Sequence, residues 1–360
     1  MRALIVTTVR DEGSFFLEWL AYHKAIGFTD FLVFSNDCSD GTDRILDRLQ
    51  DLGQIVHKPN PKRGKKAVQW QALNRASKHR LFKEADWALA TDVDEFLLIH
   101  AGQGKLEDLI ATKPDATGFA IAWRLFGNSG QFHYEDRPIT QQFLKAAPEG
   151  MLWPWRAIQF KSLFRCDGTY SRFGVHRPRD PDPAAQASSR WYDGSGHLLR
   201  SFPGPMTLIP GFHNQYRLAQ INHYSLGSVE SFLVKMARGR AVHQHESIGL
   251  SYWIDRNYVS ENDPRLWDRF GDEITERRKE MLDDEVLRDL HLAAVAWRHA
   301  RIAALMQSPE AVYLSARIRQ IGPSKVLPRN EQQELFSQLI KARQRRSIEN
   351  KSGSRPAGNT

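Results

Sequence analysis

Two carboxylates separated by one residue, Asp92 and Asp94, directly follow the apolar run at 87–90. At the end of a strand, an Asp-x-Asp pair can direct both carboxylates toward one divalent cation. Mg²⁺ and Mn²⁺ prefer oxygen ligands and commonly keep phosphate oxygens and water in their other positions. Such a cation would offset the charge of a leaving diphosphate. Because acidic residues also form ordinary turns, the interpretation depends on the surrounding elements.

Strand and helix patterns alternate through the first ninety residues. Short apolar runs predict strands, and apolar residues at helical spacing, ended by Gly27 and Gly53, predict helices. The predicted strands are 3–8, 31–34, 54–57 and 87–90, and the predicted helices are 11–26, 40–52 and 67–81. This order indicates a parallel sheet with helices on both faces, which binds ligands at the carboxyl ends of its strands. We therefore expect segments 8–12, 35–42 and 92–95 to meet at one edge.

The remainder of the chain is less regular. Strands are predicted at 119–125 and 161–165, a loop at 178–191, and helices at 272–306 and about 330–345. We therefore divide the chain into a domain at 1–260, with halves at 1–115 and 116–260, a helical region at 261–345 and a disordered basic tail at 346–360.

Composition is that of a soluble globular protein, with 41% hydrophobic and 26% charged residues. Two cysteines argue against a disulfide framework, and the apolar start is too short for a signal peptide or a membrane span. These features predict a cytoplasmic protein. Five of the eight net positive charges lie in 337–360, so peripheral contact with the inner membrane is an open alternative to a solvated terminus. No nucleic-acid partner is expected.

Several motifs occur together and in a fixed order. They are TTVRDE at 7–12, EWLAYH at 18–23, SNDCSDGT at 35–42, RGKKA at 63–67, ALNRA at 72–76, DVDEF at 92–96, HRP at 176–178 and INHY at 221–224, which leads into Lys235 and Arg238-Gly239. This series resembles family-2 glycosyltransferases, and in particular a bacterial branch whose Asp-x-Asp-Glu-Phe motif is also similar to family-92 enzymes. The resemblance spans roughly residues 3–240.

The resemblance implies a GT-A fold: an α/β protein with a mixed, mainly parallel sheet and helices on both faces, followed here by a C-terminal helical appendage. It implies Mn²⁺ or Mg²⁺ bound by Asp92, Asp94 and His223. The nucleotide-sugar-binding positions that it implies are Thr8, Arg10, Glu12, Asn36, Lys65, Asp92 and His176. Asn36 stands where the family usually has an aspartate that reads the base, which leaves the base open. Lys65 and His223 also have the alternative interpretations of a solvated lysine and a structural histidine.

A catalytic base is not singled out by the sequence. An inverting transferase needs a carboxylate that accepts the proton of the acceptor hydroxyl. We name Glu95 and Asp136 as candidates, and the other carboxylates that remain open by position are Glu135, Asp180 and Asp182.

The activity implied is transfer of a single sugar from a UDP- or GDP-sugar to a glycan or lipid-linked acceptor, since neither a membrane span nor a processive motif is present. A nucleotidyltransferase is the second hypothesis, although such enzymes usually carry a glycine-rich, basic loop after the first strand, where this chain is acidic. A phosphatase of the haloacid-dehalogenase type would carry its Asp-x-Asp after the first strand. A non-catalytic protein that binds nucleotide sugars or anionic surfaces is the third alternative.

Overall fold

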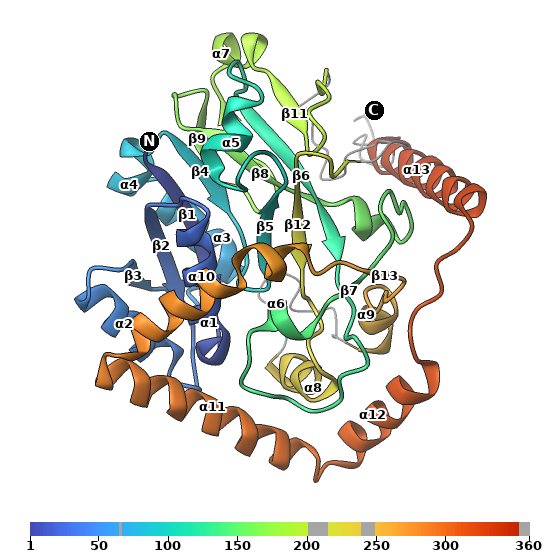
Figure 1. The fold of residues 1–360 in the computed structure, drawn as a ribbon. Helices are drawn as coiled ribbons and strands as arrows, with labels where there is room; N and C mark the ends of the chain where they lie inside the picture. Colours follow the sequence, from blue (N-terminus) through green and yellow to red (C-terminus); the bar gives the residue numbers. More distant parts are fainter. Residues whose placement is uncertain (65–66, 201–214, 239–248, 353–360) are drawn as a thin grey trace, which may run out of the picture.

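The computed structural model describes residues 1–64, 67–200, 215–238 and 249–352. Its main feature is a nine-stranded sheet in the order β3-β2-β1-β4-β8-β6-β12-β5, with β11 paired to β6 (Figure 1). The strands are β1 (Ala3–Val9), β2 (Asp30–Ser35), β3 (Val56–Pro59), β4 (Trp87–Ala90), β5 (Glu95–Ile99), β6 (Gly118–Leu125), β8 (Phe160–Arg165), β11 (Trp191–Asp193) and β12 (Ala219–His223).

Pairing in this sheet is mixed and mainly parallel. β1 pairs in parallel with β2 and β4, β2 with β3, and β6 with β11 and β12. β8 runs antiparallel between β4 and β6, and β5 runs antiparallel to β12. The predicted fold class is therefore confirmed. Because β8 joins β4 to β6, it connects the first half of the chain to the second within one sheet.

Alternating side chains of the central strands enter two different cores. Ile5 and Val33 belong to a core shared with α1 (Gly13–Ala25), α2 (Thr42–Asp51) and the C-terminal helices, whereas Leu4 and Leu32 belong to one shared with α3 (Val68–Ala76) and α4 (Arg80–Glu84). This period of two is that of a strand buried on both faces. Helices therefore cover both faces of the sheet, as predicted.

The smaller elements complete the described chain. The helices are α5 (Leu106–Ala111), α6 (Ile139–Gln142), α7 (Pro183–Ser188), α8 (Val229–Arg238) and α9 (Leu250–Ile254), with a 3₁₀ turn at Trp155–Ile158. The two small sheets pair β9 (Tyr170–Arg172) with β10 (Arg179–Pro181) and β7 (Lys145–Ala146) with β13 (Glu261–Asn262).

Three predicted elements differ from the structure. The helix predicted at 67–81 is two helices, α3 and α4, and His79 caps the second. The loop predicted at 178–191 is wrong in part, because it contains β10 and α7; Asp182 accepts bonds from the Ala184 and Ala185 amides and Pro183 occupies the first turn. The long helix at 272–306 is divided into α10 (Arg265–Leu282) and α11 (Glu285–Leu305), where Asp284 caps α11.

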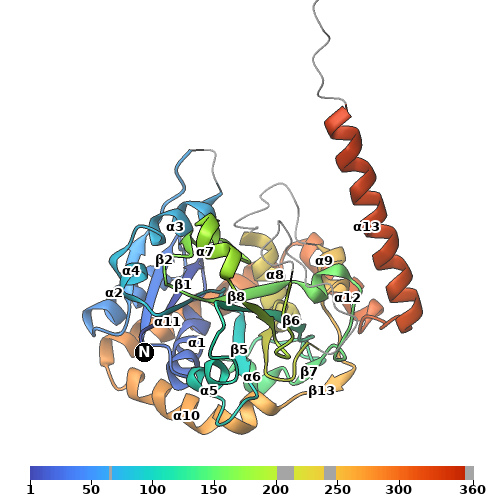
Figure 2. The same cartoon turned by 90° about the horizontal axis from the view of Figure 1, so that it is seen from above.

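The C-terminal helices have two different relations to the body. α10 and α11 pack on α1, and α11 also contacts α2 and α8. After α12 (Pro309–Ile321), α13 (Arg329–Ser352) contacts the body through Phe336 and then projects away from it (Figure 2). The helical region predicted to end at 345 thus continues to Ser352, and residues 353–360 lie outside the described part. Within that part, no helix combines the length and the apolar character needed to cross a membrane.

Candidate active site

The turn between β4 and β5 carries Asp92 and Asp94. Glu95, the first residue of β5, is completely buried, and its Oε2 accepts bonds from the Thr91 hydroxyl at 2.7 Å and the Asp92 amide at 3.0 Å. These bonds close the turn on itself. The turn is therefore held by a buried carboxylate whose Oε2 is engaged, while its Oε1 has no hydrogen-bond partner among the described residues.

Asp92 is held on one side of the turn by two partners. Lys161 of β8 places its Nζ 3.2 Å from Oδ2 of Asp92, and Gln69 of α3 donates to Oδ1 at 3.1 Å. Lys161 also lies 3.1 Å from Oε2 of Glu95 and is only 2% exposed. Burial would lower the pKa of Lys161, but the two carboxylates outweigh it and the pKa is raised. Burial raises the pKa of Glu95, which Lys161 partly opposes.

Asp94 is directed to different partners. Nζ of Lys235 on α8 lies 2.7 Å from its Oδ2, and Nε2 of His223 on β12 lies 3.8 Å from its Oδ1. Burial would raise the pKa of Asp94, but Lys235 and then His223 lower it well below its ordinary value. The carboxylate is therefore ionised at neutral pH.

His223 is buried against Trp123, with ring centroids 4.3 Å apart, and its Nδ1 has no hydrogen-bond partner among the described residues. Burial lowers the pKa of His223 to about 3. His176 also contacts Trp123, with ring centroids 5.7 Å apart, and its Nδ1 bonds to the Phe160 carbonyl at 2.9 Å. Burial lowers the pKa of His176 to about 4. Both rings are neutral and can offer a nitrogen lone pair.

The described residues fit a divalent cation in part. Oδ1 of Asp94 and Nε2 of His223 are too far apart for a hydrogen bond, so both lone pairs remain available to a cation between them. Within the ranges described, however, no three His, Cys, Asp or Glu side chains gather into a metal site. Asp92 is the predicted ligand that is turned away, toward Gln69 and Lys161. A cation bound by Asp94 and His223 would leave its other positions to phosphate oxygens and water.

Four of the seven predicted nucleotide positions lie at or just after the carboxyl ends of β1 and β2. Thr8 shares a small cavity with Gln69 and Lys161, the two partners of Asp92. Arg10 is exposed, whereas Glu12 forms an ion pair with Arg238 of α8. Asn36 is buried directly after β2. Lys65 lies outside the described residues.

A hydrogen-bonded chain that starts at the exposed Asp47 supports the β2 end. Oγ of Ser35 lies 2.7 Å from Nε2 of His57, and Nδ1 of His57 lies 2.7 Å from Oδ1 of Asp47. With the Nδ1 proton donated to Asp47, Nε2 of His57 can accept a hydrogen bond from the Ser35 hydroxyl. This geometry resembles a Ser-His-Asp triad, but the Ser35 hydroxyl is enclosed, which argues against a hydrolase. The chain fixes the strand end that carries Asn36.

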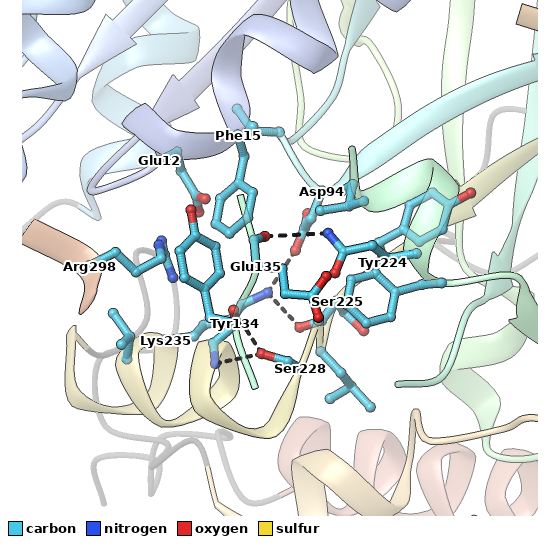
Figure 3. A pocket seen from close by; sticks show the side chains of 18 of the residues that line it. Glu12, Phe15, Asp94, Tyr134, Glu135, Tyr224, Ser225, Ser228, Lys235 and Arg298 are labelled. Carbon is cyan, nitrogen blue, oxygen red and sulfur yellow. Dashed lines mark hydrogen bonds and ion pairs between the residues drawn. The ribbon is translucent and has the colours of Figure 1, made fainter. Parts of the chain in front are cut away.

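A cavity of about 50 Å³ opens on the Asp94 side of the turn (Figure 3). The elements that line it are far apart in the sequence: the β1–α1 junction, the turn before β5, α6 and the loop before it, α8 and the segment before it, and α11. Its lining residues are Glu12, Phe15, Val93, Asp94, Tyr134, Glu135, Ile139, Gln142, Phe143, residues 224–228, Ser231, Val234, Lys235, Arg238 and Arg298. This volume holds a few water molecules and, without opening, no whole sugar nucleotide.

The candidate bases occupy different environments. Glu95 is enclosed in the turn. Asp136 is held at 2.9 Å by Arg278 of α10 and at 3.2 Å by His291 of α11, and it does not line the cavity. Glu135 lines the cavity. Asp180 pairs with Arg172 at 3.1 Å, and Asp182 caps α7; neither lies beside the Asp92–Asp94 turn.

Sequence reasoning did not find the cations of the site. Lys161, Arg238 and Arg298 contact acidic or aromatic partners 66 or more positions away in the chain: Glu95, Glu12 and Phe15 respectively. Lys235 and Arg238 were noted only as part of a motif. No local pattern marks such cations, because their partners come from other elements. The sequence does carry one signal for these cations: Lys161 lies inside an apolar strand, where a buried lysine needs an acidic partner.

Comparison with known proteins decides the family. The sequence model of the family described as "Glycosyltransferase family 92" matches residues 6–186, which is half of the chain. The chain belongs to glycosyltransferase family 92. The matched segment of this family 92 member holds the Asp92–Asp94 turn and Lys161, whereas His223, Lys235, Arg238 and Arg298 lie beyond it.

Two plant members of family 92 are similar to part of this chain. A protein of Oryza sativa subsp. japonica is 26% identical over 153 residues, which is 40% of this chain, and one of Ricinus communis is 26% identical over 144 residues, which is 38%. In each case the similarity covers 25% of the relative's length. Among solved structures, S. aureus TarS 1–349 in complex with UDP aligns with a TM-score of 0.29 and 16% identity, over 46% of this chain and 47% of that chain.

Proposed function

We propose that this family 92 chain is a metal-dependent glycosyltransferase that moves a single sugar from a UDP- or GDP-sugar to a glycan or lipid-linked acceptor. The observation that carries the proposal is the Asp92–Asp94 turn, which lies inside the family-matched segment and faces a buried, neutral histidine with a free lone pair. Family membership supports the reaction class, and the donor set of Asp94 and His223 supports the metal.

Asp92 and Asp94 have different roles in this proposal. Asp94 and His223 hold Mn²⁺ or Mg²⁺, and an imidazole ligand favours Mn²⁺. The bound cation offsets the charge of the leaving diphosphate. Asp92 stays with Lys161 and Gln69 on the side of the turn where Thr8 lies, and we propose that the nucleoside binds on that side. Lys235 adds a fixed positive charge next to Asp94.

Glu135 is the carboxylate that we propose as the general base. Three carboxylates line the cavity, and two of them, Asp94 and Glu12, are paired with Lys235 and Arg238. The pair between Glu135 and Arg137, at 3.1 Å, is exposed on both sides, so solvent screens it. Glu135→Gln should abolish turnover and leave donor binding unchanged. A parallel loss of donor binding would assign Glu135 to the donor site instead.

The function is tested by titrating UDP, GDP and their common sugar conjugates into the protein with and without Mn²⁺, alongside Asp94→Ala. Metal-dependent binding of one nucleotide sugar, lost in the variant, is the expected result and identifies the base. Wild-type protein that is folded and binds none of them with metal present would overturn the proposal in favour of a non-catalytic binding protein. Binding of a nucleoside triphosphate in preference to a nucleotide sugar would favour the nucleotidyltransferase. Contact between the basic C-terminal residues and anionic lipid stays a prediction.

A further inference from the structure

Arg298 is a buried cation in the wall of the cavity. It belongs to α11, which lies far along the sequence from the glycosyltransferase motifs, and its exposed fraction is 3%. Its guanidinium lies over the Phe15 ring at 4.4 Å and the Tyr134 ring at 5.4 Å, and Figure 3 shows these three side chains together. Aromatic faces stabilise a cation but do not neutralise it.

No carboxylate of the described residues forms an ion pair with Arg298. Its hydrogen bonds run from Nε to the Ser14 hydroxyl at 3.0 Å and from Nη2 to the Asp11 carbonyl at 3.2 Å, and both acceptors are uncharged. The carboxylates that line the cavity have other partners: Glu12 pairs with Arg238, Asp94 with Lys235 and Glu135 with Arg137. A guanidinium has five N–H donors, so most of those of Arg298 remain available.

Two buried hydroxyl groups in the same cavity also have no partner among the described residues. They are the phenol of Tyr134 and the hydroxyl of Ser225, which are 6% and 1% exposed. A buried donor without a partner costs about 1–3 kcal/mol. Unfilled donors in the same cavity as a cation without an ion-pair partner are surroundings that an oxyanion can complete.

We propose that this cavity is an oxyanion subsite in which Arg298, Tyr134 and Ser225 bind a carboxylate or phosphate group of the acceptor. The acceptor is therefore an acidic sugar or a phosphate-bearing glycan rather than a neutral one. This inference rests on the proposed transferase function. It deepens that function by naming the chemical class of the acceptor.

One alternative source of the same chemistry is the phosphate of the donor. Arg298 lies on the Asp94 side of the turn, whereas Thr8, Gln69 and Lys161 lie together on the other side. This separation argues against contact with the nucleoside, whereas a diphosphate on a cation at Asp94 would lie on the same side of the turn as Arg298. The experiment below keeps the two sources apart.

The test measures binding of inorganic phosphate, glucuronate and glucose, and separately of UDP with Mn²⁺, to wild type, Arg298→Met and Arg298→Lys. Arg319→Met is the matched control. The guanidinium of Arg319 also lies over an aromatic ring, 3.9 Å from the centroid of Phe132, but Arg319 does not line the cavity. Arg298→Lys keeps the charge and guards against a misfolded methionine variant. Each variant is first checked for a wild-type thermal transition.

We expect wild type and Arg319→Met to bind phosphate and glucuronate but not glucose. Arg298→Met should weaken both anions about tenfold with UDP affinity unchanged, and Arg298→Lys should lie between. Anion affinities unchanged in folded Arg298→Met, or glucose bound as well as glucuronate, would overturn the subsite. A parallel loss of UDP affinity in Arg298→Met would overturn the assignment to the acceptor. If wild type does not bind UDP, the proposed transferase function is refuted. The phosphate and glucuronate affinities would then still show whether the cavity binds anions.

Discussion

Nζ of Lys235 and Oδ2 of Asp94 lie 2.7 Å apart, on the same carboxylate whose Oδ1 faces His223 across 3.8 Å. One oxygen of Asp94 is thus neutralised by the protein, and the other is left for a cation. A lysine this close repels a divalent cation but attracts a diphosphate. The pair therefore links metal binding to donor binding.

Lys235→Met should consequently change metal binding and donor binding in opposite directions. We expect Mn²⁺ alone to bind about tenfold more tightly, because the repelling charge is gone, and UDP in the presence of Mn²⁺ to bind less tightly. Titration calorimetry of both ligands checks this, with Lys341→Met on α13 as a control distant from the cavity. Weaker binding of Mn²⁺ alone in Lys235→Met would mean that the lysine positions Asp94 and does not oppose the cation.

Lys161 gives a stability prediction. Lys161→Met removes the cation shared by Asp92 and Glu95 and leaves Glu95 buried without a counter-charge, which should cost about 3–5 kcal/mol of unfolding free energy. Adding Glu95→Gln should restore part of this loss, because the second buried charge is then removed as well. Urea unfolding of the two single variants and the double variant measures the coupling. Strictly additive losses would contradict a direct charge interaction between Lys161 and Glu95.

Glu18 positions one wall of the cavity. Its carboxylate is buried on α1 and accepts bonds from the Ile139 amide at 2.7 Å, the Thr140 amide at 3.0 Å and the Thr140 hydroxyl at 2.7 Å. Glu18→Gln turns one acceptor oxygen into a donor and should destabilise the protein by about 1–3 kcal/mol. Hydrogen exchange should quicken at 139–142. Thr140→Val, which removes only the hydroxyl bond, should have a smaller effect; an equal effect would show that the backbone bonds contribute little.

His23 makes stability depend on pH. Burial lowers its folded-state pKa from 6.5 to about 3, and the Trp19 carbonyl opposes this only in part. Between these values the unfolded chain binds a proton that the folded chain does not. Stability contributed by the neutral ring is therefore complete above pH 6.5 and falls as the pH falls toward 3.

His23→Phe should reduce this pH slope by up to about 1.4 kcal/mol per pH unit, since one protonation is removed. The ring stack on Phe96, with centroids 5.7 Å apart, can be kept by phenylalanine. Denaturant unfolding at several pH values from 8 to 4 checks the slope. An unchanged slope would assign the acid sensitivity to other groups, such as His176 or His223.

Local patterns explain how far the sequence could predict the structure. The strands β1, β2 and β4 and the turn after β4 were predicted because apolar runs and the adjoining carboxylates lie within a few residues of one another. The break at Asp284 was missed because an aspartate inside an apolar period does not distinguish a helix cap from an exposed position. Lys161, Arg238 and Arg298 were missed because their pairing is decided by tertiary packing, which no spacing in the sequence records.

α11 is synthesised after the other elements that line the cavity. The strands and the Asp92–Asp94 turn leave the ribosome long before Arg298, and domains generally begin to fold from the N-terminus during synthesis. A nascent chain that ends before α11 lacks Arg298 and therefore lacks that part of the cavity wall. Docking of this late helix on α1, α2 and α8 thus completes the cavity, so that ligand affinity reports whether α11 has docked.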